Sequence, residues 1–315
     1  HAPFGLTTEY HADSLFRYQA IESSVRVIDI NPAMAWKIHE DFSIGLGLDI
    51  QYMDVELTSA VDYGAVCLGA TMDPGLCAAF GLNPQQVDGS NKVGGDGVAY
   101  GWNLGFMWDA SDALTLGLSH RSSVEHELEG QAEFNNVPDL FTNMGLFQNG
   151  TIQADFDSPE LTMLAAKYQL NDRWTLAADA ARTQWSNFKE LRIRFDNPVQ
   201  PDSAEEFDWL DVTRFSGGTE YHYSDKLTLR AGVSFDESPI NEAERSVRLP
   251  SADRVWYAMG GSYQWSAKTS FDAAYVYLTV DDPITLDRTG ATGDRIVGTY
   301  EGDASIFSLQ LNHSF

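Results

Sequence analysis

The chain ends in the segment "SIFSLQLNHSF", residues 305–315, and the alternating pattern of this segment decides the fold. After Ile306 the hydrophobic and polar positions alternate: Phe307, Leu309, Leu311, His313 and Phe315 on one side, and Ser308, Gln310, Asn312 and Ser314 on the other. A period of two is that of a β-strand with one apolar and one polar face. In a soluble protein such a terminal strand is an exposed edge that invites aggregation, whereas the last strand of a membrane barrel pairs with the first. We therefore predict a closing barrel strand whose lipid-facing residues are Phe307, Leu309, Leu311 and Phe315.

The composition excludes a helical membrane protein and argues against a nucleic-acid-binding protein. The 315 residues have a mean hydropathy of -0.27, and no apolar run approaches the roughly 18 residues that a spanning helix needs. A barrel remains compatible, because only alternate residues of a barrel strand must be apolar. Acidic residues outnumber basic ones by 46 to 20, which argues against nucleic acid as a partner. The charge fits the external loops of an outer-membrane protein, or simply a well-solvated acidic surface.

Alternating segments recur in pairs along the chain. Five pairs are joined by short polar turns at His39-Glu40-Asp41, Ala110-Ser111-Asp112, Asn171-Asp172, Ser224-Asp225 and Ser266-Ala267. Longer connections lie at residues 61–96, 134–157, 197–206, 238–253 and 281–298. Short turns at one end and long loops at the other are typical of an outer-membrane barrel. We predict an all-β fold, an antiparallel transmembrane β-barrel that occupies residues 1–315 as one domain, with about 11–12 strands present.

Two segments near the C-terminus indicate what lines the interior. In residues 255–265 and 271–278 one face is rich in aromatic side chains, and the other carries Trp256, Val276 and Leu278. With the aromatic face toward lipid, these three residues line the lumen. A water-filled porin lines its channel with polar and charged groups. An apolar patch inside therefore indicates either a packed plug or a tunnel for hydrophobic molecules.

The two cysteines, Cys67 and Cys77, lie in "AVCLGATMDPGLCAAFG" (65–81). They make a poor metal site, since no His or further Cys lies nearby. A disulfide that closes a small external loop suits an oxidising compartment, and two unpaired buried thiols are the alternative. We predict the disulfide.

Several segments resemble the FadL family of outer-membrane long-chain fatty acid transporters, in the same order along the chain. They are residues 8–52, 100–130, 185–191 ("WSNFKEL"), 235–265 and the terminal Phe315. The resemblance implies a 14-stranded barrel in the outer membrane of a Gram-negative bacterium, with an N-terminal hatch in its lumen. Hydrophobic molecules pass inward through such barrels and leave sideways through a gap at a kinked third strand. We accordingly expect a monomeric transporter with no enzymatic activity and no cofactor, surrounded by lipid and lipopolysaccharide.

The resemblance places the start of this chain at the kinked third strand. The segment "APFGLTTEY" (2–10) matches the end of that strand, where Pro3 cannot donate a ladder hydrogen bond and Gly5 permits unusual torsions. Pro3 and Gly5 are therefore expected at the lateral opening, and the hatch and the first two strands have no counterpart here. Phe315 resembles the terminal residue that the barrel-assembly machinery recognises, so this machinery is an expected partner.

In this family the two longest loops form an external groove that gathers substrate. The matching loops here, near 61–96 and 134–157, carry Leu68, Met72, Leu76, Phe80, Leu82, Leu140, Phe141, Met144, Leu146 and Phe147. A loop as apolar as "PDLFTNMGLFQNG" (138–150) usually marks binding. We expect Phe80, Leu82 and the five hydrophobic residues between 140 and 147 to line the groove. The alternative is a small loop core over the barrel mouth, and such a core could form the floor of the groove.

One departure from the family concerns the cargo. Fatty acid carriers of this family hold the carboxylate with an Arg and a Lys, and the matching positions here are Ser59 and Glu205. These residues disfavour a carboxylate, unless Lys189, Arg192 or Arg194 replaces the cations. We predict neutral or weakly polar hydrophobic molecules as cargo, with fatty acids second.

Two other functions are weaker alternatives. A nonselective porin is disfavoured by the apolar lumen and loops. A hydrolase is disfavoured because His120, in "LSHRSS" (118–123), lies too far along one strand from Ser122 for a direct bond and no third catalytic group can be assigned.

Overall fold

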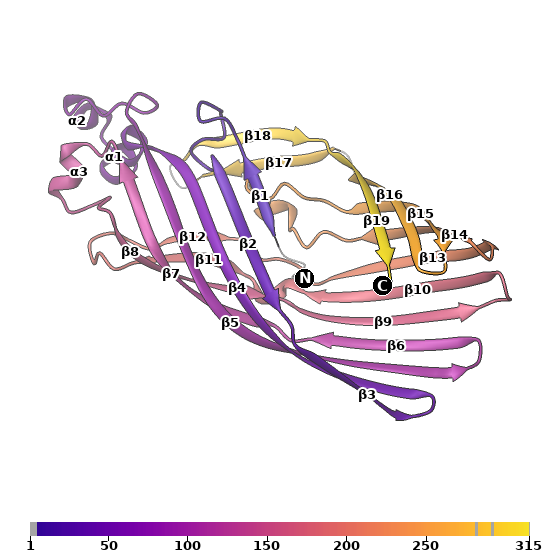
Figure 1. Cartoon of the computed structure of the whole chain (residues 1–315). Coiled ribbons are helices and arrows are strands. Elements are labelled where there is room, and N and C mark those ends of the chain that lie inside the picture. The colour runs from indigo at the N-terminus through magenta and orange to yellow at the C-terminus, as the bar shows by residue number, and fades with distance from the viewer. Residues whose placement is uncertain (1–4, 281–282, 291–292, 315) are drawn as a thin grey trace.

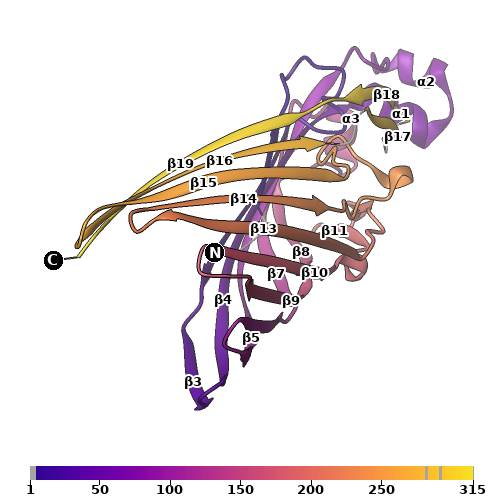
Figure 2. The same ribbon diagram turned by 90° about the vertical axis from the view of Figure 1, so that its right-hand side faces the viewer.

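Antiparallel pairing of strands builds one curved wall in the computed structural model of the chain (Figures 1 and 2). The structure describes residues 5–280, 283–290 and 293–314. In this part of the chain 17 strands belong to one sheet, and two further strands form a separate hairpin. The predicted all-β class is confirmed.

The wall begins with two very long strands. Its first members are β1 (Leu6–Glu9), β2 (Glu22–Ile30), β3 (Ala33–His39), β4 (Phe42–Asp62) and β5 (Asp88–Ser111). β2 and β3 follow one another along β4, interrupted at Pro32, which has no N–H to donate. All 21 residues of β4 pair with residues 88–108 of the 24-residue β5. A tilted strand crosses a bilayer with about 9–11 residues, so both strands continue well beyond the membrane.

The wall forks where β5 changes partner. The strands of the fork are β6 (Leu114–Arg121), β7 (Val124–Asn135), β8 (Gly150–Ser158), β9 (Glu160–Gln169), β10 (Trp174–Gln184), β11 (Glu190–Phe195), β12 (Ser203–Glu206) and β13 (Val212–Ser224). Residues 103–111 of β5 pair with β6, and residues 90–96 pair with β7. One branch continues through β9, β10 and β13, and the other through β8, β11 and β12.

Four consecutive wall strands break at this fork, along a line that we call the crease. The breaks lie at residues 122–123, at Pro159, at 185–189, which include the 3₁₀ turn Trp185–Asn187, and at 207–211. Other groups take over where the ladder stops: Trp102 N donates to Ser122 Oγ (3.0 Å), and Phe207 N donates to the carbonyl of Lys189 (2.7 Å). The wall can therefore fork without leaving these backbone groups unpaired.

Hairpins complete the wall, and the connections at its two ends differ. The remaining strands are β14 (Leu227–Asp236), β15 (Arg254–Ser266), β16 (Thr269–Val280), β19 (Asp303–His313) and the separate hairpin of β17 (Ile284–Thr289) and β18 (Arg295–Tyr300). The helices α1 (Tyr63–Thr71), α2 (Pro74–Ala79) and α3 (Asp139–Asn143), and the 3₁₀ turn Glu242–Glu244, lie in long connections at the loop end. Tight turns join the strands at the opposite, turn end. No helix in the described residues is long and apolar enough to cross a membrane.

The last strand presents the face that its sequence predicts. β19 pairs with β16 so that Phe307, Leu309 and Leu311 lie opposite Tyr275, Ala273 and Phe271. These side chains point outward, and Leu309 is 85% exposed. Ser308 lies on the inner face, opposite Ala274. Phe315 lies outside the described residues.

A charge on the outer face of β19 should destabilise the protein far more than the same charge on the inner face. We expect Leu309→Arg to lower the free energy of unfolding in phosphatidylcholine vesicles by about 2–4 kcal/mol, the cost of Arg near the midplane of the lipid face. Ser308→Arg is the matched control and should cost clearly less. Urea titration, read by heat-dependent gel mobility, measures both; equal effects of the two substitutions would contradict the assignment of faces.

Candidate functional site

The two long loops pack together into a lobe at the loop end. Its buried side chains are Tyr63, Cys67, Cys77, Leu82 and Phe141, with Val61, Val66, Val87, Val137, Leu140, Leu146 and Phe147 packed against them. Five of the predicted groove residues therefore belong to a small loop core. The sequence left a loop core and a groove both open, and the structure contains the core.

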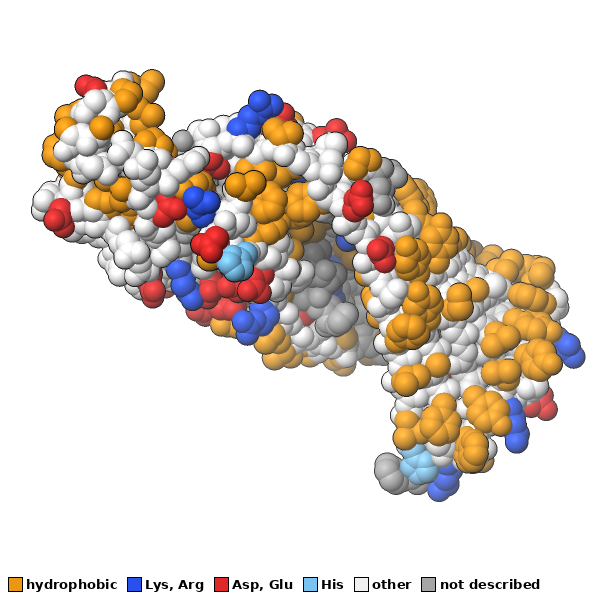
Figure 3. Space-filling model, turned by 90° about the horizontal axis from the view of Figure 1, so that it is seen from above, with side chains coloured by type: hydrophobic (Ala, Val, Ile, Leu, Met, Phe, Trp, Pro, Cys, Tyr) orange, Lys and Arg blue, Asp and Glu red, His pale blue; other side chains and the backbone are white. Residues whose placement is uncertain are grey.

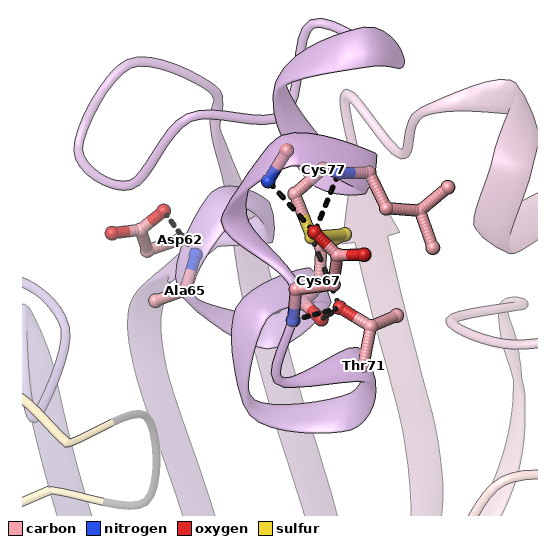
Figure 4. Close-up of a disulfide and its surroundings, with 8 residues drawn as sticks. Asp62, Ala65, Cys67, Thr71 and Cys77 are labelled. Carbon is pink, nitrogen blue, oxygen red and sulfur yellow. Dashed lines mark hydrogen bonds between the residues drawn. A yellow bond between two sulfur atoms is a disulfide. The ribbon is translucent and has the colours of Figure 1, made fainter.

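Caps and a disulfide hold the helices of this lobe (Figure 4). Asp62 accepts from Ala65 N at the start of α1 (3.0 Å) and from Gln85 N in the returning chain (2.7 Å). Cys67 and Cys77 are joined by a disulfide, with their Cα atoms 6.0 Å apart. The cross-link ties α1 to α2 and so restricts the lobe without help from the barrel wall.

Four hydrophobic side chains remain on the surface of the lobe, and we call them the loop patch: Met72, Leu76, Phe80 and Met144. Phe80 is 57% and Met144 56% exposed. Figure 3 shows hydrophobic side chains over this lobe. Of the predicted groove residues, Phe80 and Met144 are therefore available to a ligand from outside, whereas Leu82 and Phe141 are buried.

Hydrophobic contacts continue from the lobe into the wall. Phe147 packs against Tyr63 and Phe141 in the lobe and against Phe134 of β7, with ring centroids 5.3–5.5 Å apart. Phe134 belongs to an inner-wall cluster with Val93, Ala132 and Ile152. A cavity of about 20 Å³ lies between this cluster and the next one, of Met53, Val55 and Leu128; it is lined by Val55, Leu57, Val93, Leu128, Ile152, Ala154, Leu191 and Ile193, with Gly94 and Gly95.

The predicted lumen residues share the inner face of β15 and β16. Trp256 lies opposite Leu278, and Ala258 lies opposite Val276. Trp256 lines an open cavity of about 540 Å³, and Val276 lines a neighbouring one of about 280 Å³. All three residues lie toward the loop end of the wall.

The inner wall is polar toward the turn end. Arg230 Nε donates to Glu220 (2.6 Å) and its Nη1 to Ser262 Oγ (2.6 Å); Ser262 donates to Asp272, which also accepts from Asn312 (2.7 Å). This polar ladder crosses β13, β14, β15, β16 and β19 in succession. Near the loops the inner wall thus has an apolar patch at Trp256, Val276 and Leu278, and near the turns it is polar. The ion pair of Arg254 with Asp236 (3.0 Å) shares this face, on the loop side of the patch.

Two of the cations considered for a carboxylate, Arg192 and Arg194, do not line the interior. Arg192 and Arg194 alternate with Leu191, Ile193 and Phe195 along β11, and they point outward, paired with Glu190 (2.8 Å) and Asp155 (2.7 Å) respectively. Lys189 precedes β11, in the crease. The sequence reasoning missed Arg248, whose Nε lies 3.3 Å from Glu205 Oε2. The segment "SVRLP" (246–250) contains this Arg, but nothing in the sequence indicates that it pairs with Glu205.

The structure bears differently on the predicted lateral opening and on the disfavoured hydrolase. Pro3 lies outside the described residues, and Gly5 directly precedes β1, so the lateral opening stays a prediction. His120 bonds Thr162 Oγ1 through Nδ1 (2.8 Å) and packs on Trp102 at 5.2 Å. This arrangement gives no support to a nucleophile–base pair with Ser122. In the described part of the chain no cluster of ligating side chains could hold a metal.

A wall of long antiparallel strands with an apolar outer face, tight turns at one end and long loops at the other defines an outer-membrane β-barrel protein. The family model described as outer membrane protein transport protein (OMPP1/FadL/TodX) matches residues 1–315. The chain therefore belongs to this family of outer-membrane transport proteins of Gram-negative bacteria. The resemblance inferred from the sequence is confirmed.

Relatives and solved structures agree with this assignment. The chain is 25% identical to the long-chain fatty acid transport protein of Escherichia coli O6:H1, over 99% of this chain and 72% of that protein. It is 24% identical to outer membrane protein P1 of Haemophilus influenzae, over 99% of this chain and 70% of that protein. The fold is similar to a Pseudomonas aeruginosa FadL homologue (TM-score 0.87, 23% identity, 99% and 73% coverage) and to the Pseudomonas putida toluene transporter TodX (TM-score 0.66, 20% identity, 97% and 75% coverage).

We predict that the disulfide is present in the protein isolated from outer membranes. Alkylation with iodoacetamide in denaturant should leave the mass unchanged without reductant and add two adducts, at Cys67 and Cys77, after reduction. Cys67→Ser/Cys77→Ser should cost the lobe about 2–3 kcal/mol, because a short covalent loop is lost from the unfolded state. Two adducts without reductant would contradict the prediction.

The lobe should lose stability in alkali because of Tyr63. Its hydroxyl is buried with no hydrogen-bond partner among the described residues, and burial raises its pKa to about 12. The folded lobe therefore holds the neutral phenol: its stability is complete below the ordinary pKa of 10.0 and falls as the pH rises toward 12. Subtilisin cleavage within residues 63–87 should accelerate above about pH 10. Tyr63→Phe should remove this acceleration, and an unchanged pH profile would refute the assignment.

Proposed function

We propose that the protein takes up neutral or weakly polar hydrophobic molecules, captured on the loop patch and passed along the apolar inner wall. They would leave sideways through the wall near Pro3 and Gly5. Membership of the family supports a function in transport in general. The E. coli relative is named for transport of long-chain fatty acids, and a protein of similar fold is named a toluene transporter. These two names span the kinds of hydrophobic cargo that we consider for this protein.

The observation that carries this proposal is the continuity of hydrophobic side chains from the outside to the interior. The loop patch lies on the helices and helix ends that carry the lobe core, Phe147 joins that core to Phe134 of the inner wall, and the small apolar cavity joins the two clusters below. A hydrophobic molecule gains roughly 25 cal/mol for each Å² of apolar surface that it removes from water. It therefore stays bound to such a surface while moving along it.

Uptake of tritiated dodecanol by cells that carry the protein in their outer membrane tests this function. Phe80→Asp/Met144→Asp charges the loop patch without disturbing the buried core, and it should lower the initial rate about three- to ten-fold, since two apolar contacts are lost. Val297→Asp is the matched control, because Val297 is an exposed hydrophobic residue of the separate β17–β18 hairpin.

The same protein in liposomes separates this function from a nonselective porin. Sucrose should cause no swelling beyond that of protein-free liposomes, because the path proposed for the cargo is lined by apolar side chains. Rapid swelling in sucrose, together with dodecanol uptake that ignores the loop patch substitutions, would overturn the proposal.

A further inference from the structure

Arg248, from the connection between β14 and β15, reaches across the interior between two distant strands. Its Nη1 donates to Ser23 Oγ (2.8 Å) and to the carbonyl of Glu22 (3.4 Å), both on β2. Its Nε lies 3.3 Å from the Glu205 carboxylate on β12. Its own carbonyl accepts from Thr8 Oγ1 of β1 (2.8 Å). The guanidinium is therefore held in place from both sides.

The ion pair sits beside the small apolar cavity of the inner wall. Ser23 lies opposite Leu57 in register, and Glu205 lies opposite Leu191. Both leucines line the small apolar cavity that joins the inner-wall clusters. The Arg248 side chain is 14% and the Glu205 side chain 29% exposed. Burial lowers the pKa of Arg248, and the charge of Glu205 acts in the opposite direction.

This arrangement has a chemical consequence for cargo. A guanidinium on an apolar path is the group that best captures a carboxylate, by charge and by paired N–H donors. Here Glu205 already supplies the carboxylate, and Nη1 donates to β2. A second carboxylate would meet the negative charge of Glu205 and would have to break the existing pair in partly desolvated surroundings.

We propose that Glu205 is a built-in counterion that occupies the carboxylate position on Arg248, so that this path accepts uncharged hydrophobic molecules and rejects carboxylates. The inference rests on the proposed function and assigns its selectivity to one residue. Ser59, the other position that lacks the expected cation, lies in register with Asn91 and adds no charge that offsets Glu205.

Dodecanol and laurate test the inference, because they share a twelve-carbon chain and differ in the charge of the head group at pH 7.5. Binding of each radiolabelled ligand is measured with the detergent-purified protein. The parent protein should bind dodecanol at least about ten-fold more tightly than laurate. Glu205→Gln should raise laurate affinity about ten-fold or more while dodecanol affinity stays within about two-fold, because only the carboxylate responds to an Arg248 charge that Glu205 no longer neutralises.

Two further variants complete the experiment. Glu206→Gln is the matched control: it removes the same charge from the next residue of β12, which lies opposite Glu190, and should change neither affinity. Glu205→Gln/Arg248→Gln should lose the gain in laurate affinity. Heat-dependent gel mobility checks that each variant is folded.

The outcomes separate the inference from the proposed function. Dodecanol binding with no gain of laurate in Glu205→Gln, or a gain that persists without Arg248, overturns the counterion role and leaves the function standing. A parent protein that prefers laurate overturns the counterion role directly, whatever the variants do. Absence of binding for both ligands in every form overturns the proposed function, and the inference with it.

Discussion

The structure depends on one constraint: backbone N–H and C=O groups inside a hydrocarbon layer must find partners within the protein. Antiparallel ladders between neighbouring strands meet it over most of the wall, and the full-length pairing of β4 with β5 is the longest case. Where the wall forks, Ser122 Oγ accepts from Trp102 N, and the carbonyl of Lys189 accepts from Phe207 N. The crease is therefore an ordered change of partners.

Because the ladders fix the wall through the backbone, the side chains of its two faces are free to serve different purposes. The outer face presents exposed hydrophobic side chains such as Leu309 to the lipid. The inner face carries a hydrophobic path from Phe147 downward, with a neutralised cation beside it at Arg248. In the proposed function, the path of the cargo and its selectivity therefore belong to the inner face.

The sequence predicted those features that depend on local pattern. The alternating pattern of residues 305–315 predicted the strand and its outward face. Short polar turns such as Asn171-Asp172 predicted the hairpins. Loop residues have no period, so the burial of Phe141 and the exposure of Met144 could not be told apart. The pair of Arg248 with Glu205 joins segments far apart in the chain, and only their three-dimensional arrangement reveals it. The fork could not be predicted either, because it depends on which distant strands pair with β5.

The polar ladder on the inner wall determines where water can cover this wall. Its members, from Glu220 to Asn312, keep hydrogen-bonding groups on the surface of five adjacent strands, and water spreads over such a surface. At Trp256, Val276 and Leu278 the same wall carries apolar side chains instead. A hydrophobic solute on this wall therefore meets a rise in free energy at the ladder, because it would have to displace water from hydrogen-bonding groups there. In the proposed function, the ladder therefore limits how far along the barrel axis the cargo travels before it leaves sideways.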